Sequence, residues 1–316
     1  MAVARGAVLA VVLLSTAAAP AWASFPGRNG AIAYQVSEGD RYSGHATSIR
    51  TVVPRSGQVR VLRECLLRTT GPDCSLGSPR YSPDGLRIAF PIATHFPGTP
   101  EPSRTELGIL ASDGTRFESH TTANLYSRPA WSPRGNQFLL QRSGVPEDGP
   151  AAMVIASLEG TELRHVSPGA ASGRTVPEPD WSSRGEIAFV SARAGCVFPC
   201  KKDIYVTRVG ATPRRLTLRG GESPSWSPNG SKLAFVRRAS PTASRGDIYT
   251  LKRNGRGLRR LTRGFSPTWS PDGKWIAFTR GRDLHLIRPN GKRRHRLLRD
   301  VSDGTGKAVD WQPLPR

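Results

Sequence analysis

Short apolar runs separated by turn residues follow one another along this chain from about residue 30 onwards. The clearest stretch is residues 265–298, FSPTWSPDGKWIAFTRGRDLHLIRPNGKRRHRLL. Residues 266–270, 274–280, 283–288 and 294–298 are predicted strands, because Pro, Asp, Asn and Gly fill the gaps between them with turn chemistry. Four antiparallel strands in about 35 residues make one propeller blade.

The first two strands of this unit, with the turn between them, recur along the chain. The copies are RYSPDGLRIAF at 80–90, AWSPRGNQFLL at 130–140, DWSSRGEIAFV at 180–190, SWSPNGSKLAF at 225–235 and TWSPDGKWIAF at 268–278. Their aromatic anchors are separated by 50, 50, 45 and 43 residues, and Trp311 follows 42 residues later. The anchors are Tyr81, Trp131, Trp181, Trp226 and Trp269. A period of about 40–50 residues with turn residues at fixed offsets indicates a propeller or a solenoid.

The two ends of the chain predict how the array closes. Residues 30–34 (GAIAY) match a second strand that no aromatic first strand precedes, and residues 308–312 (AVDWQ) match a first strand with no blade after it. We expect the C-terminal strand to complete the N-terminal blade, because closure removes exposed sheet edges. The prediction is an all-β protein, a six-bladed β-propeller of four-stranded blades over residues 24–316. Its first blade comprises about residues 30–65 with 308–312, and the others begin near residues 78, 128, 178, 223 and 266.

These repeats resemble those of exported bacterial members of the TolB-like six-bladed β-propeller family, which carry WSPDG-xx-IAF, then DIY or DLY, then RLT. The later elements are Asp203-Ile204-Tyr205 with Arg215-Leu216-Thr217, and Asp247-Ile248-Tyr249 with Arg260-Leu261-Thr262. The third blade departs from the pattern, because residues 152–155 stand where the Asp-Ile-Tyr element is expected. The resemblance implies the fold over nearly all of the chain after residue 23, and a shared fold does not by itself imply function.

Residues 1–23 are a predicted secretory signal peptide. Arg5 gives a positive start, residues 7–14 are apolar, and Ala21-Trp22-Ala23 offers a small-x-small cleavage site. The apolar run is shorter than the roughly 20 residues that span a membrane, and no Cys precedes Cys65 to carry a lipid. We expect cleavage after Ala23 and a secreted or cell-envelope-associated protein without a transmembrane segment.

Charge is high and uneven along the chain. The net charge is +22, and residues 201–316 hold 27 Lys or Arg against 8 Asp or Glu, largely on predicted outer strands and their turns. We favour edge protection as the explanation, because charged side chains deter pairing between exposed strands. The alternative is a surface for anionic polymers or lipid headgroups, with Arg293, Arg294 and Arg296 as its candidate residues. Nucleic acid is disfavoured, because export separates the protein from it.

Four cysteines form two close pairs, Cys65 with Cys74 and Cys196 with Cys200. An even count in an exported chain favours disulfides, and a propeller places the two pairs on different sides of the ring. We therefore expect pairing within each close pair. A metal site is disfavoured because the two spacings lie in separate blades with no neighbouring His, and we predict no metal or cofactor.

The sequence contains no recognisable catalytic motif. It contains no G-x-S-x-G elbow, H-E-x-x-H helix, P-loop or Rossmann fingerprint. Asp203, Asp247 and Asp283 recur at the starts of third strands, and the tryptophans recur with the blades, so both sets are predicted to be structural. We favour an exported, monomeric, non-enzymatic binding module for a protein, a peptide or an anionic cell-envelope polymer. The alternative is a lyase or a lactonase-type hydrolase whose site is assembled from loops over the central channel.

Connections between second and third strands are long in every predicted blade except the last, whereas the turns between third and fourth strands are short. The long connections are residues 37–46, 91–104, 143–150, 191–202 and 238–245. They emerge on one face together with both cysteine pairs, which predicts a recognition surface over the channel mouth. Neutral loop growth is the alternative. The candidate ligand-binding residues are Glu38, Asp40, His45, His95, Glu101, Arg104, Glu147, Asp148, Arg193, Lys201 and Arg245.

Overall fold

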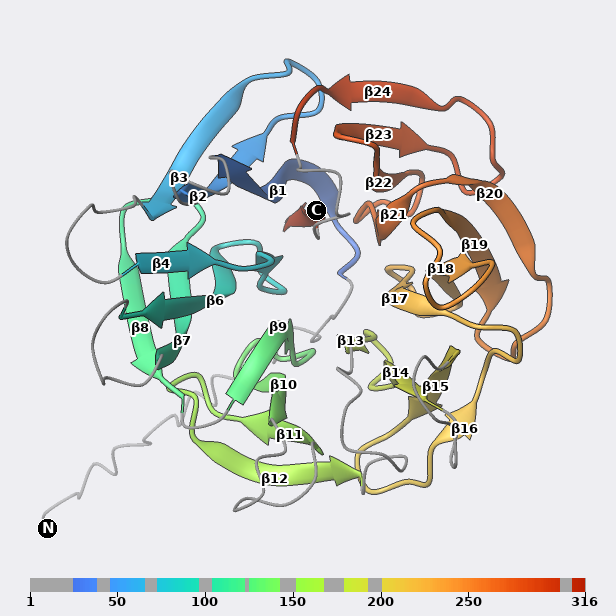
Figure 1. Cartoon of the computed structure of the whole chain (residues 1–316), viewed down its shortest axis with the longest axis horizontal. Coiled ribbons are helices and arrows are strands. Elements are labelled where there is room, and N and C mark those ends of the chain that lie inside the picture. The colour runs from blue at the N-terminus through green and yellow to red at the C-terminus, as the bar shows by residue number, and fades with distance from the viewer. Residues whose placement is uncertain are drawn as a thin grey trace, which may run out of the picture.

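The chain forms six β-sheets arranged as blades around a central axis in the computed structural model (Figure 1). The structure describes residues 25–38, 46–65, 73–96, 104–122, 125–142, 152–167, 179–192, 201–301 and 309–315. Every regular element within these ranges is a β-strand. The predicted all-β propeller of six blades is therefore confirmed. The predicted signal peptide lies outside the described residues.

The first three blades come from the N-terminal half of the chain and the last strand. Blade 1 contains β1 (Arg28–Glu38), β2 (Ala46–Val52), β3 (Val59–Cys65) and the C-terminal β25 (Val309–Leu314). Blade 2 contains β4 (Asp73–Leu76), β5 (Arg80–Tyr81), β6 (Arg87–His95), β7 (Arg104–Ala111) and β8 (Phe117–Thr121). Blade 3 contains β9 (Leu125–Trp131), β10 (Phe138–Arg142), β11 (Ala152–Ala156) and β12 (Glu162–Ser167).

The remaining three blades follow in chain order. Blade 4 contains β13 (Asp180–Trp181), β14 (Ile187–Ala192), β15 (Lys202–Thr207) and β16 (Arg214–Arg215). Blade 5 contains β17 (Glu222–Trp226), β18 (Lys232–Arg238), β19 (Gly246–Lys252) and β20 (Arg259–Arg263). Blade 6 contains β21 (Phe265–Trp269), β22 (Ile276–Arg280), β23 (Asp283–Ile287) and β24 (His295–Leu298). The first strands lie toward the centre and the outermost strands at the periphery (Figure 1).

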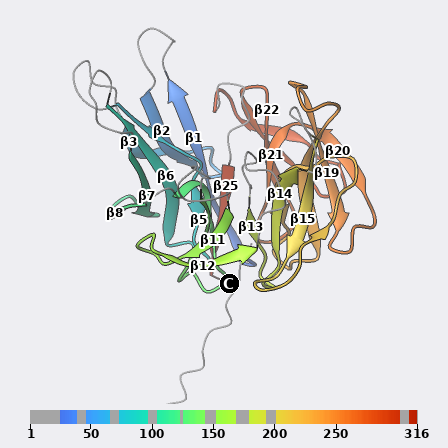
Figure 2. The same cartoon turned by 60° about the horizontal axis from the view of Figure 1, so that its bottom comes forward.

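The ring closes as predicted, because β25 pairs antiparallel with β1 (Figures 1 and 2). Trp311 lies opposite Ile32 in this pairing, and its indole Nε1 donates a hydrogen bond to the Gly30 carbonyl at 3.1 Å. The next residue, Gln312, reaches blade 2, where its amide donates to the Gly85 carbonyl at 2.8 Å. Gly85 has a φ of +71°, and a Cβ there would lie 1.9 Å from the Pro313 carbonyl oxygen, so only glycine fits.

Blade 2 differs from the predicted four strands because its innermost strand is split. β4 and β5 both pair with β6, in a five-stranded sheet. Residues 77–79 separate them, and Pro79 has no N–H to donate to a sheet ladder. The Gly77 amide still donates to the Pro91 carbonyl at 2.7 Å. The pairing of β4 with β6 therefore extends to His95. It includes residues 92–95, which the sequence analysis predicted to lie in the long connection 91–104.

The hydrophobic core lies between neighbouring blades. One cluster joins Ala89 and Leu107 of blade 2 to Trp131, Phe138 and Val154 of blade 3. The aromatic anchors are buried at every repeat, and Trp226 is fully enclosed. Since burying a large apolar side chain contributes roughly 1.5–3 kcal/mol, each anchor ties its blade to the preceding one. This is the packing role that the sequence predicted for them.

A disulfide bond joins Cys65 to Cys74, with the two Cα atoms 5.8 Å apart. Cys65 ends the outermost strand of blade 1, and Cys74 lies in β4 of blade 2, so the bond links two blades. In the chain-entropy model, closing a loop of about ten residues stabilises the fold by about 2–3 kcal/mol. The predicted Cys196–Cys200 bond lies outside the described residues.

Candidate functional site

The residue before each aromatic anchor lines the central channel. Successive side chains of a strand point to opposite sides, so an anchor that packs between blades turns its predecessor toward the axis. The six predecessors, one from each blade, are Asp310, Arg80, Ala130, Asp180, Ser225 and Thr268, and all of them line a cavity of about 50 Å³. The channel therefore carries two acids and one arginine on an otherwise small and neutral ring.

Arg80 ties three blades together across this channel. Its Nη2 donates to Asp180 Oδ1 at 2.6 Å, and its Nη1 lies 3.7 Å from Asp310 Oδ1. Each carboxylate also accepts a backbone N–H from the following blade, Trp226 for Asp180 and Tyr81 for Asp310, both at 2.7 Å. The side chains of the three charged residues are only 10–17% exposed. Arg80 reaches past blade 3, where Ala130 is too short to obstruct it.

The pKa of Asp310 is raised overall, because burial outweighs the opposing effect of Arg80. Burial raises the pKa of the Asp310 carboxyl, while the positive charge of Arg80 and the hydrogen bonds from Tyr81 and Thr268 lower it. The remaining cavity of about 50 Å³ has room for one or two water molecules. The sequence analysis missed this group. Its signal was present, however, as charged residues at a repeat position that other blades fill with Ala, Ser or Thr.

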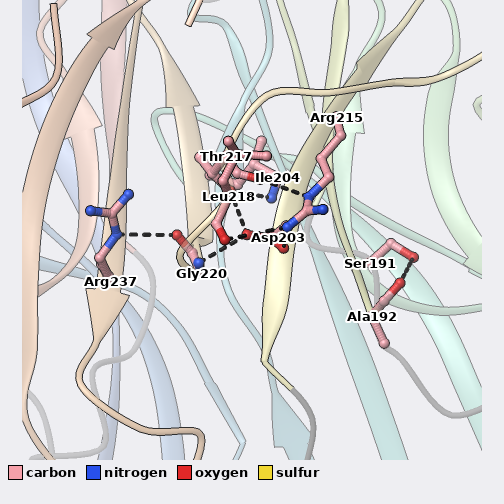
Figure 3. Close-up of polar contacts among 9 residues, drawn as sticks. All are labelled: Ser191, Ala192, Asp203, Ile204, Arg215, Thr217, Leu218, Gly220 and Arg237. Carbon is pink, nitrogen blue, oxygen red and sulfur yellow. Dashed lines mark hydrogen bonds and ion pairs between the residues drawn. The ribbon is translucent and has the colours of Figure 1, made fainter. Parts of the chain in front are cut away.

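The third-strand aspartates form a second polar set, and Asp203 is its most buried member (Figure 3). Asp203 accepts hydrogen bonds from Arg215 Nη2 at 2.7 Å, Thr217 Oγ1 at 3.1 Å and the Gly220 amide at 2.9 Å. It thereby fastens β15 to β16 and to the connection that leads to blade 5. Asp247 pairs in the same way with Arg260 at 2.8 Å, and Asp283 with Arg296 at 3.2 Å. The predicted structural role fits this repeated pairing.

We expect Asp203→Ala to lower the free energy of unfolding by about 3–5 kcal/mol, because it leaves the Arg215 charge and two further donors unpaired. Asp247→Ala is the matched control. Its carboxylate is 31% exposed and its partner 52% exposed, so the loss should be about 1 kcal/mol or less. Urea denaturation followed by circular dichroism measures both. Equal losses would contradict a special role for the buried site.

The predicted recognition face lies largely beyond the described residues, which exclude Asp40, His45, Glu101, Glu147, Asp148 and Arg193. Glu38, His95 and Arg104 lie on strand ends, because β1, β6 and β7 extend further than the sequence indicated. The Arg104 guanidinium lies 5.3 Å from the centre of the Phe96 ring. Lys201 and Arg245 are exposed. The recognition surface stays a prediction.

The predicted polyanion residues lie in and just before the edge strand of blade 6. Arg296 is paired with Asp283, and Arg294 Nη1 donates to Thr262 Oγ1 at 3.3 Å. Arg293 is exposed in the connection before β24, with a φ of +56°. One of the three charges is therefore already balanced by an acid.

A basic groove of about 430 Å³ lies at the boundary of blades 5 and 6. We use the name basic groove for the site lined by five cations, Lys232, Lys252, Arg259, Lys274 and Arg288. It lies at the end of the blades where second strands begin and third strands finish. This end is opposite to the long connections that the sequence analysis favoured.

The sequence pattern of the TolB β-propeller domain matches residues 69–314 of the chain. The chain belongs to the TolB β-propeller family. It is 34% identical over 137 residues to a TolB homolog of Chlorobium luteolum, a match that covers 42% of this chain and 28% of that protein. The match thus spans less than a third of the relative's length.

Solved structures resemble this TolB-family propeller in fold. The nidogen/laminin complex contains a chain that it matches with a TM-score of 0.60 and 11% identity, over 90% of this chain and 99% of that one. An acylaminoacyl peptidase of Pyrococcus horikoshii matches with a TM-score of 0.55 and 14% identity, over 88% of this chain and 46% of the peptidase. Identities this low show the propeller fold alone.

Within the residues that the structure describes, no group of three His, Cys, Asp or Glu side chains is placed to hold a metal ion. The same part of the chain contains no helix that is long and apolar enough to cross a membrane.

Proposed function

We propose that this TolB-family propeller is an exported, non-enzymatic binding module whose ligand is an anionic polymer of the cell envelope. The observation that carries the proposal is the surplus of cations without acidic partners in blades 4 to 6. Export is supported by the signal-like residues 1–23 and by the Cys65–Cys74 disulfide, which is typical of oxidising compartments.

The acids of residues 201–301 are already engaged. Five of them pair with arginines: Asp203 with Arg215, Glu222 with Arg238, Asp247 with Arg260, Asp283 with Arg296, and Asp300 with Arg282. The sixth, Asp272, accepts hydrogen bonds within its own turn from Ser270 Oγ and the Lys274 amide. The other cations create a positive potential that attracts polyanions.

Edge protection accounts for only part of this charge. It explains cations on outermost strands, such as Arg263 and those near β24. It does not explain Lys232, which begins the second strand of blade 5, or Lys274, which lies in the turn before β22. These two cations lie inside the ring of outer strands and favour a ligand-binding role.

The small volume of the channel cavity supports binding at the surface over chemistry at the centre. Pockets for small molecules usually measure about 300–1,000 Å³, whereas the channel cavity measures about 50 Å³. The charged groups of the channel are Arg80, Asp180 and Asp310, and they contact one another. They are therefore already engaged and are less available to a substrate.

The proposal predicts salt-sensitive binding of a polyanion to the chain from residue 24 onward. Long-chain inorganic polyphosphate should bind at low ionic strength, and log K should fall linearly with log salt by about 0.7 for each phosphate neutralised. Fluorescence anisotropy measures this, with neutral dextran as the control. Absence of binding at low salt, or binding indifferent to salt, would contradict the proposal.

A further inference from the structure

The basic groove collects its cations from two blades. Lys232, Lys252 and Arg259 come from β18, β19 and β20 of blade 5, whereas Lys274 and Arg288 flank β22 and β23 of blade 6. Cations up to 56 positions apart in the chain thus line one site. Thr250 and Asn290 add a hydroxyl and an amide to the same lining, so hydrogen-bond donors stand beside the charges.

The charges of the basic groove have no counter-ion from the protein. No Asp or Glu lines it, and none of its five cations makes an ion pair with any residue that the structure describes. Like charges held close together repel, and a bound anion would relieve that repulsion. By contrast, six of the other arginines of blades 4 to 6 pair with acids of the same blades.

Two of the cations contact neighbouring residues of the protein. The Arg288 guanidinium carbon lies 4.2 Å from the centre of the Trp275 ring, a cation–π contact. The Lys252 side chain contacts Gly257, and its carbons lie 3.6–3.8 Å from the position that a Cβ on Gly257 would take. The planar guanidinium of Arg288 suits phosphate oxygens, which accept two parallel N–H bonds.

The groove continues toward the centre of the ring. A second hollow of about 500 Å³ shares Lys232 and Lys274 with it and reaches Pro228, Pro271 and Gly27 beside the channel. Asp272 is the one carboxylate among the residues that line this second hollow. The two hollows therefore share two lysines, and a chain longer than a single ion can contact both of them.

We infer that the basic groove binds a linear phosphate-bearing polymer, whose phosphate oxygens contact Lys232, Lys252, Arg259, Lys274 and Arg288. The inference rests on the proposed function and locates its ligand. It also moves the polyanion site away from Arg293, Arg294 and Arg296 to the boundary of blades 5 and 6. The ligand chemistry is that of successive phosphate groups along one flexible chain.

Two variants with equal charge test the site. The groove variant carries Lys232→Gln, Lys252→Gln, Arg259→Gln and Lys274→Gln. The control carries Arg219→Gln, Arg245→Gln, Arg263→Gln and Arg299→Gln, which removes four exposed cations elsewhere. All eight side chains are exposed, so both variants should melt within about 2 °C of the parent.

Polyphosphate binding should separate the two variants. The groove variant should bind on the order of 30-fold more weakly, and its salt slope should fall by about 0.7 for each lost phosphate contact. The control should change less than about threefold, because its cations act only at long range through salt. Equal weakening would overturn the groove and leave the proposed function standing. Failure of the unmodified protein to bind would overturn both.

A second measurement with the same two variants distinguishes binding of a polymer from binding of a lipid surface. Vesicles of phosphatidylglycerol present the same phosphate chemistry on a flat support, whereas polyphosphate is a free chain that can lie along the groove. The groove variant should differ from the control with polyphosphate and should match it with vesicles. A groove effect confined to vesicles would overturn the linear-polymer assignment, and tight saturation by inorganic phosphate alone would do the same.

Discussion

A chain that ends at residue 308 should lose the ring closure and melt at least about 10 °C below the intact protein. The deletion removes β25, the innermost strand of blade 1, and leaves the edge of β1 unpaired. It also removes Trp311, which is 4% exposed, and losing a buried tryptophan alone costs about 3–5 kcal/mol. For a protein of this size, 1 kcal/mol corresponds to about 2–4 °C in melting temperature.

Circular dichroism during heating measures the effect of this deletion. A chain that ends at Leu314 is the control, because it keeps β25 and removes only Pro315 and Arg316. That control should melt within about 2 °C of the intact protein. An unchanged melting temperature for the shorter chain would show that the fold does not depend on closure.

Replacement of Arg80 by Leu should cost about 3–5 kcal/mol at neutral pH, because it leaves the Asp180 and Asp310 carboxylates without their cation in the channel. The loss should depend on pH. Burial already raises the pKa of Asp310 above its ordinary value, and removal of Arg80 raises it further. A carboxyl with a raised pKa holds its proton more tightly when folded, so stability falls as pH rises through that pKa.

Urea denaturation at pH 4 and pH 8 tests the channel tie. The difference in unfolding free energy between the parent and Arg80→Leu should be smaller at pH 4, where a protonated Asp310 needs no cation. Arg87→Leu is the matched control from the same blade. Arg87 donates to the Gly135 carbonyl and stacks 4.9 Å from the Trp131 ring, so its loss should be equal at both pH values. A pH-independent loss for Arg80→Leu would argue against an electrostatic tie.

The sequence by itself determined the ring, its six blades and its closure. The information is local and written once per repeat: an aromatic anchor, a Pro-Asp-Gly type of turn and a strand of apolar residues. Each repeat buries its apolar face only against a neighbour, so a fixed period implies a stacked array, and unmatched halves at the two ends imply closure. The Cys65–Cys74 bond followed from proximity in the chain.

Only the tertiary structure decided what meets at the channel and in the basic groove. Arg80 and Asp180 are 100 residues apart, and their contact depends on the missing side-chain bulk at Ala130 in the blade between them. The basic groove likewise depends on how blade 6 is set against blade 5, and the split strand of blade 2 depends on pairing with the extended β6. Local patterns specify turns and buried faces. Contacts between residues of different blades depend on the packing between blades, which no single repeat encodes.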